Sequence, residues 1–145
     1  MGDDALQRYL KRVDRMGEPA LVYSATLDVD AALLALETCF PGRPLFLLRA
    51  TGPLESTVEE VFETFRNSFE GRGVLGIVVN AHVPAPLLRA VERICTDNHL
   101  TLHGEGGWKP LKPPPDWRMV VLARVADAAA LEGGMASWFS STLAL

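Results

Sequence analysis

The feature that most constrains the fold is the alternation of short uncharged apolar runs with longer segments of helical periodicity. Such runs, without polar residues at every second position, predict strands buried on both faces of a parallel sheet. Glycine, proline and asparagine residues punctuate the segments between them and predict where each helix ends. Strands are expected at residues 20–23, 45–48, 74–79, 119–122 and 141–145, and helices at 4–16, 29–40, 57–69 and 84–98.

Strands that alternate with helices form right-handed β-α-β units, so the predicted fold class is α/β. We expect a three-layer sandwich with a mostly parallel five-stranded sheet, in which residues 74–79 form a central strand and residues 29–40 form a buried helix. Because 145 residues provide one core, residues 1–145 are expected to be a single domain. Residues 1–17 form a lead-in helix, and residues 100–112 form a hairpin insertion outside the sheet.

The composition is that of a folded soluble domain, with 48% hydrophobic and 22% charged residues. No apolar run is long enough to span a bilayer, and the first fifteen residues are too polar for a secretory signal, so a cytoplasmic protein is expected. Cys39 and Cys95 lie in apolar helical patterns and are expected to be reduced, buried thiols. The net charge of -4 argues against nucleic acid as a partner, although basic residues could still gather locally.

The segment at residues 24–31 follows the first predicted strand, where a phosphate-binding loop of the form G-x-x-x-x-G-K-[ST] would lie. Its length fits, but its chemistry does not. Ser24 and Val29 stand at the glycine positions, Asp30 at the lysine position, and Ala31 at the position of the magnesium-binding hydroxyl. A carboxylate about 5 Å from a phosphate charge costs about 3 kcal/mol at an effective dielectric constant of about 20.

The carboxylate that would hold magnesium should follow the strand at residues 74–79. In the corresponding Walker B segment, residues 77–81, Asn80 and Ala81 stand where acids would be needed. We therefore expect no ATP hydrolysis, no catalytic residue, no bound cofactor and no metal ion. Cys95, His99 and His103 are spaced four apart, but the helix is expected to break among them and no fourth ligand is evident, so a zinc site is not predicted.

The C-terminal part, residues 100–145, has the most specific pattern. It has a hairpin, a proline-rich approach to the strand at 119–122, a Val-Ala-Asp segment at 125–127, and Met-Ala-Ser at 135–137. Together with the order of elements, this pattern resembles the AAA+ (P-loop NTPase) module of dynein heavy chains, with midasin-type modules as the next family. The resemblance implies that Trp138 stands where such modules carry an arginine finger that acts on the neighbouring module's nucleotide.

This resemblance covers nearly all of the chain after Gly17. It implies a degenerate AAA+ large subdomain that ends before the helical lid, as a fragment, a short isoform or a remnant of a microtubule-motor protein. A structural role follows, with neighbouring AAA+ modules or other motor subunits as protein partners, in the cytoplasm at the cytoskeleton or axoneme. Apolar surface left exposed without a lid or neighbours would also favour self-association.

Two other functions stay open from the residues alone. One is a nucleotide-sensing domain that binds through backbone groups of the 24–31 loop without hydrolysis. The other is a stand-alone Rossmann-like adaptor that binds a protein partner through its tryptophan-bearing C-terminal half, although such an adaptor has no reason to carry the hairpin at residues 100–112.

Overall fold

A computed structural model describes residues 2–51, 58–104 and 107–145 of the chain. The elements follow the predicted order, with an additional pair of short 3-10 helices before the last strand. They are α1 (Gly2–Met16), β1 (Ala20–Tyr23), α2 (Val29–Cys39), β2 (Leu45–Ala50), α3 (Val58–Glu70), β3 (Val74–Val79), α4 (Ala85–Asp97), β4 (Leu100–Gly104), β5 (Gly107–Leu111), β6 (Arg118–Ala123), η1 (Ala128–Ala130), η2 (Glu132–Trp138) and β7 (Thr142–Ala144).

Five strands form one parallel sheet in the order β2-β3-β6-β1-β7. The predicted α/β fold with a five-stranded parallel sheet is therefore confirmed. Residues 74–79 form an interior strand buried on both faces, as predicted: β3 lies between β2 and β6, and β6 occupies the middle position of the sheet. Both strands are buried on both faces, and such strands read alike in sequence, so their order could not be predicted.

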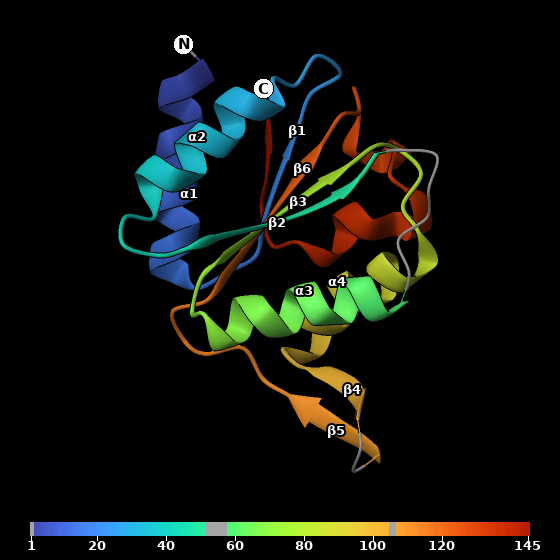
Figure 1. Cartoon of the computed structure of the whole chain (residues 1–145). Helices are drawn as coiled ribbons and strands as arrows, with labels where there is room; N and C mark the ends of the chain where they lie inside the picture. Colours follow the sequence, from blue (N-terminus) through green and yellow to red (C-terminus); the bar gives the residue numbers. More distant parts are fainter. Residues whose placement is uncertain (1, 52–57, 105–106) are drawn as a thin grey trace.

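Helices cover both faces of the sheet, with α1 and α2 on one face and α3 and α4 on the other (Figure 1). Successive side chains of β3 alternate between the two layers: Val74 and Val78 pack with α1 and α2, whereas Leu75 and Ile77 pack with α3 and α4. The helix expected as a lead-in is part of this packing, since α1 buries Leu10 completely.

Helix α2 is less buried than its composition suggested. Ala32, Leu36 and Cys39 are buried, but Leu34 is 63% exposed, because α2 packs on α1 and β3 with its remaining face toward solvent. The prediction of a fully buried helix was therefore wrong.

The hairpin of β4 and β5 is antiparallel and forms a sheet of its own, as predicted. It extends away from the main sheet beyond α3 and α4 (Figure 1). Residues 52–57, which include the first residue of the helix predicted at 57–69, lie outside the described residues. None of the helices described is both long enough and apolar enough to cross a bilayer.

Candidate functional site

The carboxyl ends of β1, β3 and β6 meet at one edge of the sheet, where a parallel α/β fold places its ligand. Backbone hydrogen bonds connect the segments that leave these strands. Ser24 N–H donates to the carbonyl of Ala123 at 3.1 Å, and Arg124 N–H donates to the carbonyl of Val79 at 3.0 Å. The structure thus brings the two predicted degenerate motifs, at residues 24–31 and 77–81, to the same edge.

Three backbone N–H groups of the segment from Ser24 to Ala31 donate to acceptors within that segment. The Asp28 carboxylate caps α2 by accepting the N–H of Ala31 at 3.1 Å. Ser24 accepts twice, at its hydroxyl from the N–H of Thr26 (3.2 Å) and at its carbonyl from the N–H of Leu27 (3.4 Å). In a phosphate-binding loop, backbone N–H groups and the helix N-terminus bind the anion. Here, the Asp28 carboxylate occupies the helix terminus.

The open space at this loop is small and carries the wrong charge for a nucleotide. Its volume is about 220 Å³, below the roughly 300–1,000 Å³ of ordinary small-molecule pockets. Ser24 and Thr26 line it with hydroxyl groups, and Asp28 supplies its ionisable side chain. Asp30, at the lysine position of the loop, is exposed in the first turn of α2. Two carboxylates therefore stand where phosphates would require cations.

Asn80 follows β3 and makes a structural contact at the Walker B position. Its amide Nδ2 donates to the carbonyl of Thr51 at 3.2 Å, which ties the end of β3 to the end of β2. Ala81 is exposed and has no polar side chain. The position that would carry the magnesium-binding acid therefore contributes a bridge between strands.

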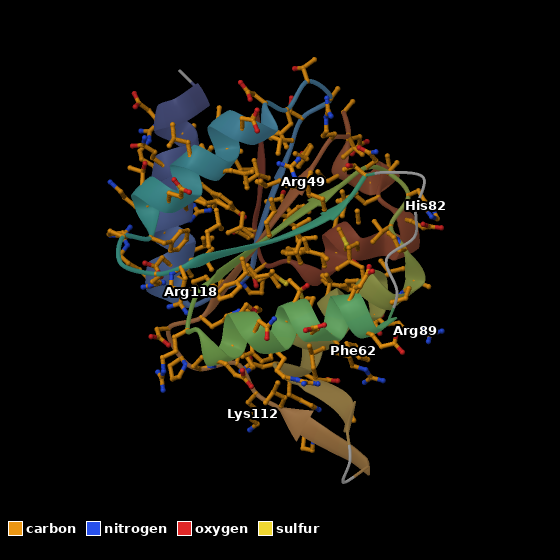
Figure 2. The ribbon with its side chains drawn as sticks, in the orientation of Figure 1. Arg49, Phe62, His82, Arg89, Lys112 and Arg118 are labelled. Carbon is orange, nitrogen blue, oxygen red and sulfur yellow. The ribbon has the colours of Figure 1, made fainter. Side chains whose placement is uncertain are left out.

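A nearby acid, Glu132 of η2, also binds the protein itself. Its carboxylate accepts the N–H of Val83 at 3.0 Å and lies 2.8 Å from Nδ1 of His82, while its own N–H donates to the carbonyl of Ala81 at 3.0 Å. His82 lies on the loop that follows β3 (Figure 2). Both side chains of the pair are largely exposed, so their attraction adds little to stability. Through these hydrogen bonds, Glu132 holds the loop after β3 against η2.

At the position where the resemblance places an arginine finger, the chain has the apolar ring of Trp138. Trp138 is half-buried and packs against the core on the α3 and α4 side. The preceding Ser137 donates its hydroxyl to the carbonyl of Gly134 at 2.7 Å. Neither side chain offers a positive charge to a neighbouring molecule.

Cys39 and Cys95 are both free of disulfides; Cys39 is buried, as predicted, whereas Cys95 is only partly buried. Burial raises the pKa of Cys95 to about 12 and also raises the pKa of Cys39, where nearby Lys11 acts in the opposite direction. Nδ1 of His99 lies 3.1 Å from the carbonyl oxygen of Asp97. The side chain of His103 lies outside the described residues, and within the part of the chain described no three acidic, cysteine or histidine side chains gather as a metal site would require.

Two functional contacts escaped the sequence reasoning. The cap by Asp28 has a local signal in the sequence, an aspartate directly before a helical pattern. The contact of Glu132 with Val83 had no such signal, because 49 residues separate the two.

The sequence matches no protein-family profile and no curated protein. The fold, however, is similar to that of RuvB from Thermotoga maritima, described as a Holliday junction branch migration motor, with a TM-score of 0.59 and 10% identity over 98% of this chain. Two variants of RuvB superpose with TM-scores of 0.64 and 0.63 at 11% and 10% identity, each over 97% of this chain. The chain spans 43% of the length of these RuvB chains.

The chain thus has the α/β fold of the AAA+ large subdomain of RuvB. At about 10% identity, this similarity concerns the fold alone. The similarity agrees with the fold that the resemblance implied, whereas the dynein type and the loss of activity stay predictions.

Proposed function

We propose that this protein is a non-catalytic AAA+-like module that acts as a structural, partner-binding domain. The observation that carries the proposal is the self-capped loop between β1 and α2, where the Asp28 carboxylate binds the N–H of Ala31 at 3.1 Å. A nucleotide phosphate would have to displace this carboxylate and approach Asp30 without a lysine to attract it.

The second support comes from the catalytic positions beyond this loop. Asn80 uses its amide to bridge β3 and β2, and Ala81 has no group to orient water or hold magnesium. Trp138 stands in place of the arginine that would act on a neighbour's nucleotide. On the pattern of residues 100–145 we further propose a relationship to dynein-type AAA+ modules, with other motor subunits as partners, in the cytoplasm.

Calorimetric titration with ATP and with ADP, each in the presence of magnesium, tests this proposal. We expect no binding heat from the unmodified chain, because its loop offers carboxylates and occupied N–H donors to the phosphates. A saturable signal with a micromolar dissociation constant would overturn the proposal in favour of a nucleotide sensor.

The matched variant is Asp28→Gly combined with Asp30→Lys, which opens the N-terminus of α2 and restores the cation. Circular dichroism must first show that this variant is folded, because Asp28→Gly removes the side-chain cap of α2, at a cost of roughly a few tenths of a kcal/mol. Binding by the folded variant alone would identify these two carboxylates as the cause of the lost affinity.

A further inference from the structure

The outer face of α1 is a strip of basic side chains. Arg8, Lys11, Arg12 and Arg15 recur at intervals of three, one and three residues, which places them on one side of the helix. All four are exposed. The opposite side of α1 packs into the core, so this basic face lies on the solvent side of the helix.

The basic face is not neutralised by the protein. None of its four side chains forms an ion pair with any residue described in the structure. The acid nearest in sequence to Arg15 is Asp14, and its carboxylate is already engaged by Arg43 at 2.9 Å and by Arg118 at 3.0 Å. Four uncompensated cations on one helix of a chain with net charge -4 indicate an anionic partner at this face.

The strand beside this helix has a free edge. β7 is the last strand of the sheet and, in the described structure, pairs only with β1. Leu145 N–H donates to the carbonyl of Tyr23 in β1 at 2.9 Å. Because backbone groups alternate in direction along a strand, Thr142 and Ala144 direct theirs to the open side.

Tyr9 brings the basic face and the free edge together. Its hydroxyl donates to the carbonyl of Ser141, directly before β7, at 2.9 Å. The guanidinium of Arg12 lies over the Tyr9 ring, 5.5 Å from its centroid. A groove of about 860 Å³ runs between the two elements and is lined by Arg8 and Arg12 on one side and by Thr142 on the other.

We propose that this groove binds an acidic, extended segment of a protein partner, which pairs with β7 as an additional strand and places carboxylates on the basic face of α1. Alternate side chains of an extended strand are about 6.6 Å apart, and Arg8 and Arg12, four residues apart on a helix, are about 6 Å apart along its axis. A carboxylate at every second position can therefore meet successive cations. The inference rests on the proposed function and names the class of partner.

The free edge distinguishes a peptide from other anions. A nucleic acid or a free phosphate uses the cations but has no backbone N–H to pair with β7, whereas a peptide uses both. Membrane lipid is disfavoured because the apolar side of α1 is buried in the core of the protein.

Fluorescence anisotropy with a labelled octapeptide of alternating Glu and Thr tests the proposal. The intact chain should bind this peptide, more weakly as salt rises to about 0.3 M, and should not bind its Gln and Thr counterpart. Arg8→Gln with Arg12→Gln should weaken binding roughly tenfold, since two exposed ion pairs are lost. The matched control, Arg66→Gln with Arg89→Gln, removes two exposed cations of α3 and α4 and should leave binding unchanged.

A peptide N-methylated at every residue has no backbone N–H donor on either edge and tests the strand pairing without altering the protein. We expect it not to bind, because it cannot donate to β7. Equal binding of the N-methylated peptide, equal binding of a thymidine octanucleotide, or no binding of the acidic peptide would each overturn the proposal. The proposed function is tested separately by the titration with ATP. If the chain binds neither ATP nor the peptide, only the present inference is refuted. If it binds both ATP and the peptide, only the proposal of a non-catalytic module is refuted.

Discussion

At the scale of single residues, a buried hydrogen bond between the side chains of Trp117 and Ser68 lies in the core. The indole Nε1 of Trp117 donates to Oγ of Ser68 at 2.9 Å, and this hydroxyl in turn donates to the carbonyl of Phe65 at 2.7 Å. The Trp117 ring also meets Phe69 edge to face, with centroids 4.8 Å apart. The hydrogen bonds satisfy both polar groups, so the large aromatic ring is buried without leaving its indole N–H unsatisfied.

Removal of one partner of this hydrogen-bonded pair should lower the stability of the domain. Ser68→Ala leaves the buried indole N–H without an acceptor, and Trp117→Phe leaves the hydroxyl without its donor. Each is expected to lower the free energy of unfolding by about 1–3 kcal/mol. Urea denaturation measures the change, and the double variant should cost less than the two single changes together. If the losses of unfolding free energy in the two single variants add up to the loss in the double variant, the two residues are not coupled. Ser137→Ala, which removes an exposed hydroxyl, serves as the control.

At the scale of elements, the turn from α3 to β3 lies directly against β2. A Cβ atom built on Gly73 would come within 2.4 Å of the Pro44 carbonyl oxygen and 2.6 Å of the Phe46 ring. A backbone oxygen cannot move aside as a flexible side chain can. The φ angle of Gly73 is not positive, so its backbone conformation is open to other residues. Glycine is required here because the two elements approach so closely.

Gly73→Ala should consequently destabilise the domain by about 1–3 kcal/mol, the usual cost of overpacking. The matched control is Gly76→Ala within β3, where the new methyl group would meet the movable Leu36 side chain at 3.2 Å. Thermal unfolding of the two variants gives the comparison. A Gly73→Ala variant as stable as Gly76→Ala would show that the turn can shift away from β2.

At the scale of the whole molecule, Asp14 connects segments far apart in the chain. Its carboxylate binds Arg43, which precedes β2, and Arg118 at the start of β6. Arg118 also donates to the backbone carbonyl of Asp14 at 2.8 Å. Figure 2 shows Arg118, the first residue of β6, near the end of α1. The end of α1 is thus fixed to the amino-terminal edge of the sheet.

Asp14→Ala should loosen α1 from the sheet. The loss leaves the half-buried Arg43 and the nearly buried Arg118 without their carboxylate, and we expect a cost of about 2–4 kcal/mol. Limited trypsin digestion should then cleave faster at Lys11, Arg12 or Arg15. Asp116→Ala, which breaks the exposed pair with Arg72, should change neither stability nor digestion measurably. Unchanged digestion of Asp14→Ala would contradict the role of Asp14.

The sequence by itself determined the type and approximate position of the α-helices and strands, and the charge at the loop between β1 and α2. These properties follow from local patterns: apolar runs, helical spacing, and prolines or glycines that end helices. Asn80, Ala81 and Trp138 could likewise be read directly as replacements at the positions of the resemblance.

Only the tertiary structure decided that β6 lies at the centre of the sheet, that α2 leaves Leu34 in solvent, and that Glu132 binds the loop after β3. It also decided that the basic face of α1 lies beside the free edge of β7. Each of these features depends on contacts between residues far apart in the chain, whose energies no local pattern contains.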